Sequence, residues 1–246
     1  MLPAGRILWY ANGMLPFRDI NPTRTFPVVT LSLIIVNVLV FFYMFRLETL
    51  GSDVLRAFVE RAALTPAALL GNDVPHAVLQ PVWLTVFTSM FLHGGPLHVG
   101  GNMLYLWIFG NNVEDAMGSG RFLLFYLLCG VAAAAAQIAT GPDSAVPMLG
   151  ASGAVAGVLG AYVVRFPAAQ VETCVFFFFI TVIRLPALIV LGFWFLLQFT
   201  QGVAALSGAD PDGGVAWWAH IGGFVAGMLF INLFAKRPAV RYNNWH

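Results

Sequence analysis

Gly150-Ala151-Ser152-Gly153 opens an apolar, glycine-rich run that ends one residue before Pro167. A helix that begins near Ser152 and stops before Pro167 has about fifteen residues and a length of roughly 22 Å. The hydrocarbon core of a bilayer is about 30 Å thick, so this helix is short for a crossing. If its far end reaches one membrane surface, Ser152 lies roughly 8–10 Å below the other surface, on the first turn of the helix.

A serine in that position has the surroundings that acyl transfer needs. Backbone N–H groups in the first turn of a helix lack intrahelical partners and lie at the positive end of the helix dipole. A hydroxyl beside such donors can attack a carbonyl while the donors stabilise the resulting oxyanion. The same small residues also suit a simple packing face between helices, so a second signal is needed to decide.

The composition indicates a polytopic membrane protein. Of 246 residues, 59% are hydrophobic and 9% are charged, whereas a soluble domain carries about 25% charged residues. The net charge of +1 argues against a nucleic-acid partner, and Cys129 and Cys174 do not make a disulfide framework. Residues 1–25 lack the apolar core and cleavage site of a secretory signal, so we expect the first apolar segment to be retained as a span.

The hydrophobic pattern predicts an all-α fold, a six-helix membrane bundle over residues 26–235. The expected spans are 26–45, 97–110 with a turn at each end, 122–139, the helix from Ser152, 185–206 and 215–234. The long connection 46–97 has charges and short apolar patches, which predicts amphipathic helix lying in the membrane interface. Charges bracket 168–183 too closely for a crossing, so a second interfacial segment is expected there.

Basic residues assign the two sides of this bundle. One side, which includes both termini, has nine basic residues: Arg6, Arg18, Arg24, Arg121, Arg165, Arg184, Lys236, Arg237 and Arg241. The other side has three, all in the first long loop: Arg46, Arg56 and Arg61. By the positive-inside rule the N-terminal segment 1–25 and the tail 236–246 are cytoplasmic, and Ser152 faces outward. We expect the protein to lie in a prokaryotic plasma membrane.

Polar side chains within spans are costly and often functional, and two groups accompany Ser152. His98 and Asn102 are spaced i, i+4 and therefore share one helix face. His220 lies in the last span, and all of these residues fall near the outward ends of their helices. Singly, an intramembrane histidine or asparagine is more often an interhelical hydrogen-bond partner; their agreement in depth favours a shared site.

Small residues suggest how the site is assembled. His220 shares its helix face with Gly223 and Gly227, which form a Gly-x-x-x-Gly surface that lets another backbone approach closely. The fourth helix has a matching surface, made of Gly153, Gly157 and Ala161. If the two surfaces meet, the imidazole of His220 comes close to the hydroxyl of Ser152.

The chemistry then assigns roles to these side chains. Neutral His220 accepts the proton of Ser152 as the oxygen attacks a carbonyl and later returns it to the leaving amine. Asn102, His98 and the Ser152 backbone N–H can donate to the developing oxyanion. The carboxyl groups nearest to His220 in sequence, Asp210 and Asp212, lie in the preceding loop, so a Ser–His pair is expected instead of a triad. For His93, at the edge of its span, a structural hydrogen bond in the loop is expected.

Three motifs carry a resemblance to a known family. On the second, fourth and sixth predicted spans lie, in order, His98-x-x-x-Asn102, Gly150-x-Ser152-Gly153 and His220-x-x-Gly223-x-x-x-Gly227. In these residues the chain resembles the rhomboid intramembrane serine proteases, over about residues 26–235. Two further stretches are similar to that family: Phe87-Thr88-Ser89-Met90-Phe91-Leu92-His93-Gly94-Gly95, and Val113-Glu114-Asp115 followed by Gly118 and Phe122.

The resemblance implies that Ser152 is the nucleophile, His220 the base, and His98 and Asn102 the oxyanion donors, with Gly150 shaping the same pocket. It also implies a six-helix bundle with a water-filled cavity that opens outward. The expected substrates are single-span membrane proteins cut within the bilayer at or near small residues, without a metal or other cofactor.

The family's proposed substrate gate lies between the second and fifth spans. Phe193, Trp194 and Phe195 are candidates to line it, although aromatic residues here also suit a lipid-facing or interfacial position. One departure from the family concerns the first long loop, where many members carry Trp-Arg and this chain has Trp83-Leu84. The anchoring of that loop is therefore left open.

Two other functions are alternatives to a protease. A non-catalytic rhomboid-like protein that holds membrane clients usually lacks the serine or the histidine, and this chain has both. A transporter or metal-binding channel that uses His93, His98 and His220 lacks a carboxylate within any predicted span, and the histidine spacing alone is a weak metal signal.

Overall fold

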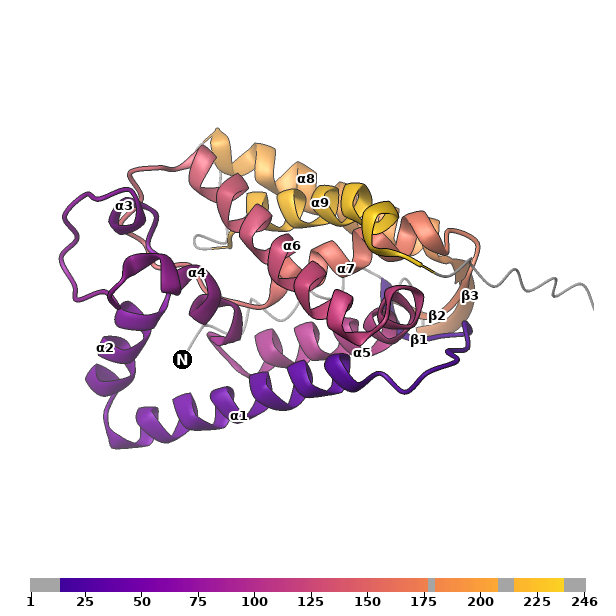
Figure 1. Ribbon diagram of the computed structural model, residues 1–246, viewed down its shortest axis with the longest axis horizontal. Coiled ribbons are helices and arrows are strands. Elements are labelled where there is room, and N and C mark those ends of the chain that lie inside the picture. The colour runs from indigo at the N-terminus through magenta and orange to yellow at the C-terminus, as the bar shows by residue number, and fades with distance from the viewer. Residues whose placement is uncertain (1–13, 177–179, 208–214, 237–246) are drawn as a thin grey trace, which may run out of the picture.

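The computed structural model describes residues 14–176, 180–207 and 215–236 (Figure 1). Outside this part lie residues 177–179 of the segment 168–183, as well as Arg6, Asp210, Asp212, Arg237 and Arg241. The long helices of the described chain are α1 Val28–Leu50, α5 Pro96–Met117, α6 Ser119–Thr140, α7 Ser152–Arg165, α8 Ala187–Leu206 and α9 Trp217–Phe234. Shorter elements join them: α2 Ser52–Ala62, α3 Pro66–Leu69, η2 Val82–Leu84, α4 Thr85–Thr88 and η3 Ser89–Phe91. The strands are β1 Met14–Asp19, β2 Gln170–Phe176 and β3 Ile180–Pro186.

The molecule has two distinct ends, which we call the sheet end and the loop end. Strands β1 to β3 lie at the sheet end, whereas α2 and α3 lie at the loop end, with the long helices running between them (Figure 1). Ser152 begins α7 on the side of the loop end, and the far end of α7 leads into β2 at the sheet end.

Four of the described helices are long and apolar enough to cross a membrane: α1, α6, α8 and α9. The helix that begins at Ser152 is apolar but has only 14 residues, as its short sequence run predicted. Helix α5 has 22 residues and ends in a polar stretch, 111–115, so it extends further than the predicted second span. Length and composition therefore support a polytopic protein with four such helices, and the count of six crossings stays a prediction.

Helix α7 lies among α5, α6 and α9 (Figure 1). Every residue from Gly153 to Val163 is buried, so the short apolar run is enclosed by protein along almost its whole length. This explains why so many of its residues are glycine or alanine: a helix enclosed on several sides can be packed closely only if its side chains are small.

The closest packing of all joins α7 to α9. A Cβ atom on Gly223 would clash with the carbonyl oxygen of Gly153, and one on Gly227 would clash with that of Gly157. A third close approach lies at Gly160, next to the predicted Ala161, where a Cβ atom would meet the carbonyl oxygen of Phe224. The two glycine surfaces therefore meet backbone to backbone.

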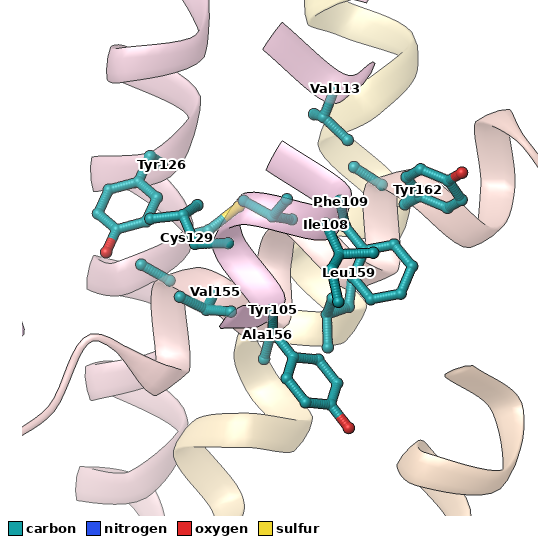
Figure 2. Close-up of a cluster of buried hydrophobic side chains, with 14 of the residues drawn as sticks. Tyr105, Ile108, Phe109, Val113, Tyr126, Cys129, Val155, Ala156, Leu159 and Tyr162 are labelled. Atoms are coloured by element: carbon teal, nitrogen blue, oxygen red, sulfur yellow. The ribbon is translucent and has the colours of Figure 1, made fainter. Parts of the chain in front are cut away.

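Large side chains fill the space toward the sheet end. Tyr105, Ile108, Phe109 and Val113 of α5 pack there with Leu159 and Tyr162 of α7 (Figure 2). The rings of Phe109 and Tyr162 meet edge to face, with centroids 4.9 Å apart. The small residues of α7 thus let this helix approach α9 closely. Its large residues, Leu159 and Tyr162, fill the core beside α5.

The sheet corrects the prediction of an all-α fold: the described chain is mostly helical but contains three antiparallel strands in the order β1-β2-β3. The segment 168–183, for which the sequence predicted an interfacial position, contains β2 and most of β3, and its place relative to a membrane stays a prediction. Val171 and Thr173 are fully buried on one face of β2, which is the alternation of a half-buried strand. Glu172 and Arg184, whose charges suggested an interface, pair with each other across β2 and β3 at 3.1 Å.

The sheet end is joined to the helices by side chains. The hydroxyl of Tyr162 donates to Asp19 at 2.8 Å, and Asn112 of α5 donates from its side chain to the carbonyl of Asn21 at 2.7 Å. A cavity of about 530 Å³ also lies here, lined mainly by 17–23 and by Trp107, Ile108 and Asn111. Its lining contains none of the predicted site residues, so this cavity is separate from the candidate site.

Glu114 of α5 holds the beginning of α1. Its side chain is 1% exposed and accepts hydrogen bonds from the backbone N–H groups of Val29 and Thr30, from the Thr30 hydroxyl and from Ser119. Helix N-termini have unpaired N–H groups and attract negative charge, so one carboxyl group here satisfies several buried donors.

Replacement of this side chain, Glu114→Ala, is expected to lower the free energy of unfolding by about 3 kcal/mol, because it leaves buried donors unpaired. The thermal unfolding midpoint in detergent measures the effect. The matched control is Glu48→Ala, an exposed residue near the other end of α1, which should change little. Equal midpoints for the two variants would contradict this role of Glu114.

Burial raises the pKa of Asp19 from 3.8 to about 6, against the opposing effect of the hydrogen bond from Tyr162. The fold thus favours the protonated carboxyl group. Folding is therefore more favourable while Asp19 is protonated. This stabilisation is complete below about pH 4 and is lost as the pH rises through about 6. Asp19→Asn keeps an acceptor oxygen for Tyr162 but cannot ionise.

The thermal midpoint of the parent protein should therefore fall more steeply between pH 4 and pH 7 than that of Asp19→Asn. Asp53→Asn, an exposed change on α2, serves as the control and should follow the parent curve. Parallel curves for the parent and Asp19→Asn would contradict the assigned role of Asp19.

Candidate active site

Ser152 and His220 form a direct hydrogen bond. Ser152 is the first residue of α7, His220 lies in the first turn of α9, and 2.8 Å separates Ser152 Oγ from His220 Nε2. The glycine contacts between the two helices bring the backbones close enough for these side chains to meet. At this distance the imidazole can accept the hydroxyl proton, which is the geometry that nucleophilic catalysis by serine requires.

The imidazole of His220 has a second partner that the sequence analysis missed. Its Nδ1 lies 2.7 Å from Oε1 of Gln198 on α8. The structure therefore adds a neutral amide to the expected Ser–His pair. The signal was present in the sequence, because a glutamine between Leu197 and Phe199 is a polar residue within a predicted span and deserved the same weight as the histidines.

Two tryptophan rings flank the same imidazole. The ring centroids of Trp194 and Trp217 each lie 6.1 Å from that of His220. Trp194 belongs to α8 and Trp217 to the first turn of α9. His220 is therefore held by hydrogen bonds at both ring nitrogens and by aromatic rings beside it.

Gly150 lies between neighbours that include both His98 and Ser152. A Cβ atom on Gly150 would lie 2.9 Å from His98 Nε2 and 3.4 Å from Ser152 Oγ, so both side chains flank this glycine. Its φ of +133° is itself unfavourable for any residue with a side chain. The backbone N–H of Gly94 donates to His98 Nδ1 at 3.4 Å, which leaves the ring proton on Nε2, the nitrogen that lies beside Gly150.

Asn102 is placed one helical turn from His98, as predicted from their spacing. It is 7% exposed, and its side chain donates to the His98 backbone carbonyl at 3.0 Å. A carboxamide has two N–H donors, so one remains after this bond. The oxyanion roles of His98 and Asn102 stay predictions.

Backbone contacts position the residues just before Ser152. The N–H of Gly150 donates to the carbonyl of Ser89 at 2.9 Å, and the N–H of Ala151 donates to Nε2 of His93 at 3.5 Å. His93 is 1% exposed and thus makes the loop hydrogen bond expected of it. These contacts fix the direction in which the chain enters α7.

The first long loop supports the same segment. Leu64 and Met148 exchange two backbone hydrogen bonds of 3.0 and 2.8 Å, and Ala67 N–H donates to the carbonyl of Ser144. Trp83, which precedes Leu84 in this loop, is 56% exposed. In this chain the loop is therefore attached to the approach to Ser152 through its backbone.

The three candidate gate residues differ in their surroundings. Trp194 and Phe195 of α8 pack against Phe224 of α9, with ring centroids 6.0 and 4.7 Å apart, whereas Phe193 is 37% exposed. Their role at a gate stays a prediction. As for the alternative of a metal-binding channel, no group of three histidine, cysteine or acidic residues that could hold a metal is found within the described parts of the chain.

Comparison with known proteins identifies the family. The family model of the rhomboid domain matches residues 80–237, which is more than half of the sequence. The chain belongs to the rhomboid family. Members of this family are generally intramembrane serine proteases, and the matched region contains His98, Ser152, Gln198 and His220.

Individual relatives share different parts of this chain. It is 43% identical to rhomboid protease GluP of Bacillus subtilis over 34% of its own length and 16% of that protein. It is 27% identical to the human presenilin-associated rhomboid-like protein, mitochondrial, over 87% of its length and 51% of the relative. Against rhomboid protein 1, mitochondrial, of Saccharomyces cerevisiae, it is 29% identical over 60% of its length and 40% of the relative.

The chain spans about half of these relatives' length or less. Two of these relatives are named as mitochondrial, and the third comes from a bacterium. A further relative, from Arabidopsis thaliana, is named as chloroplastic. Membrane helices are thus supported, but the relatives give no support to the expectation of a prokaryotic plasma membrane.

The geometry at Gly150 leads to a test of the site's construction. Gly150→Ala is expected to lower the free energy of unfolding by about 1–3 kcal/mol, because the backbone is left-handed and the new methyl group would press on His98. The thermal unfolding midpoint measures this. Gly95→Ala is the matched control, since a Cβ atom there meets nothing within 4 Å and its φ of 168° is extended. A Gly150→Ala variant as stable as this control would contradict the described geometry.

Proposed function

We propose that this rhomboid protein is a serine endopeptidase that cleaves membrane proteins within the bilayer. The observation that carries the proposal is the 2.8 Å hydrogen bond between Ser152 and His220 at the beginnings of two tightly packed helices. Membership of the rhomboid family supports the same reaction class. Substrates are single-span membrane proteins, and the reaction uses side chains and water without a metal or other cofactor.

Ser152 and His220 carry out the bond chemistry. As Ser152 Oγ attacks the scissile carbonyl carbon, its proton passes to Nε2 of His220, and a tetrahedral oxyanion forms. The C–N bond then breaks, and the leaving amine takes the proton from Nε2. Water, deprotonated by the same nitrogen, attacks the acyl-enzyme, which releases the new carboxyl terminus and returns the proton to Ser152.

The oxyanion is stabilised by groups beside Ser152. Its own backbone N–H lies in the first turn of α7, where helix donors lack an intrahelical partner. His98 Nε2 flanks the same glycine as Ser152 Oγ, and Asn102 has a second amide donor. Such donors act when they are fixed in position before charge develops, and the buried loop contacts around Gly150 provide that fixation.

The proposed arrangement in the membrane follows from the helix lengths and the basic residues. Six crossings with both termini in the cytoplasm place the loop end, and hence Ser152, on the outward side. Because α7 has 14 residues, Ser152 lies below that membrane surface, where a substrate helix can present its peptide bond.

A non-catalytic rhomboid-like protein that binds membrane clients is the alternative. It would need neither a Ser–His hydrogen bond nor a preserved nucleophile, so the hydrogen-bonded pair favours the protease. A substitution at the serine decides between the two functions.

Ser152→Ala is expected to abolish cleavage of a single-span model substrate reconstituted with the purified protein in lipid, because the nucleophile is removed. Product formation is followed by gel and mass spectrometry. Ser32→Ala, which removes an exposed hydroxyl on α1, is the matched control and should cut like the parent. Cleavage by Ser152→Ala at the parent rate, with an unchanged thermal midpoint, would overturn the assignment.

A further inference from the structure

Gln198 is an unusual residue in its helix. The buried residues of α8 are Ala187, Val190, Leu191, Gln198 and Gly202, and Gln198 is the polar one among them. Its side chain is 9% exposed, and its carbonyl oxygen points to the imidazole of His220 at 2.7 Å. Burying a polar side chain within a membrane helix costs free energy unless the side chain is hydrogen-bonded, and such residues are often functional.

The partner atoms define the proton arrangement on the ring. An amide oxygen can only accept a hydrogen bond, so Nδ1 of His220 must carry the ring proton and donate it to Gln198 Oε1. In a neutral imidazole the other nitrogen, Nε2, is then unprotonated. That nitrogen lies 2.8 Å from Ser152 Oγ and is free to accept the hydroxyl proton.

We propose that Gln198 is a positioning residue for the reaction: its amide oxygen holds His220 in the tautomer and orientation that let Nε2 act as the base. This inference rests on the proposed function and adds a third member to it. When His220 becomes an imidazolium ion during the reaction, Nδ1–H donates to the same oxygen, and a bond to a charged donor is stronger than one to a neutral donor. Gln198 therefore supports the charged ring more than the neutral ring.

Because the hydrogen bond between Gln198 and His220 joins α8 to α9, the orientation of His220 depends on where α8 lies. A second hydrogen bond joins the two helices nearby, from Trp218 Nε1 of α9 to the carbonyl of Gly202 at 3.1 Å. Trp194, one turn before Gln198, lies beside the imidazole. The remaining surface of α8 is largely exposed: Leu188, Ile189, Leu196, Phe199 and Val203. A shift of α8 away from α9 thus separates Gln198 from His220 and removes the support of the base.

The test uses the full-length protein in lipid with a single-span model substrate. Gln198→Met keeps nearly the same volume but lacks the amide oxygen. It is expected to lower kcat by about tenfold or more, which corresponds to the loss of one hydrogen bond made stronger in the transition state, with KM within about twofold of the parent. In nitrogen NMR spectra of His220, the fraction protonated at Nδ1 should fall.

Gln198→Glu is the conservative rescue. Its carboxylate still accepts from Nδ1–H and adds a negative charge beside the ring, which favours the imidazolium ion. We expect kcat within about threefold of the parent at neutral pH or above, and the acid limb of the pH profile should move to higher pH. A residue that only fills space would produce neither the rescue nor this shift.

Gln201→Met is the matched control. Gln201 lies three residues further along α8 and is half-buried, so the same substitution there should leave kcat, KM and the pH profile unchanged. A parent-like kcat and parent-like tautomer ratio in Gln198→Met would overturn the inference. If Gln198→Met does not fold, as shown by its thermal midpoint, the pH profile of Gln198→Glu decides, and an unmoved acid limb counts against the proposal.

Failure of this inference is distinguishable from failure of the protease assignment. If the parent cleaves, Ser152→Ala does not, and the Gln198 variants behave like the parent, only the role of Gln198 is lost. If Ser152→Ala cleaves as well as the parent, the proposed function itself is wrong, and the role of Gln198 falls with it.

Discussion

The close contact between α7 and α9 is the constraint on which the rest of the site depends. Gly153 and Gly157 meet Gly223 and Gly227 so closely that a single methyl group at either α9 glycine would collide with a carbonyl oxygen. In a membrane, where apolar side chains gain little from leaving lipid, packing of this kind is what holds helices together. Here it also sets the separation and rotation of the helices at which Ser152 and His220 form a hydrogen bond.

The surrounding elements serve the same geometry from both sides. Toward the loop end, Ser89 and His93 fix the backbone before Ser152, and Leu64 ties the first long loop to that segment. Toward the sheet end, Tyr162 joins α7 to Asp19 of β1. The short helix that begins with Ser152 is thus held at both of its ends.

Much of this arrangement was predictable from the sequence, because its signals are local. The short run before Pro167 predicted the 14-residue helix, and the glycine spacing predicted which faces of α7 and α9 meet. Strand β1 was not predicted, since Met14 pairs with Val175, which is distant in the sequence, and no local pattern reveals such a partner. Strands β2 and β3 pair locally, but the charges around them suggested an interfacial segment instead. Gln198 was recognisable as a polar residue within a predicted span, but its partner depends on which face of α8 turns toward His220, and that is fixed only by tertiary packing.

Mapping the covalent adduct formed by a fluorophosphonate, a reagent that reacts with activated serine hydroxyl groups, tests the central claim most directly. The account predicts one adduct, on Ser152, found by peptide mass spectrometry in the parent protein and lost in His220→Ala with the thermal midpoint retained. An unmodified parent, or an adduct on Ser152 that forms equally fast without the imidazole, would contradict the claim that the contact between α7 and α9 creates an activated serine.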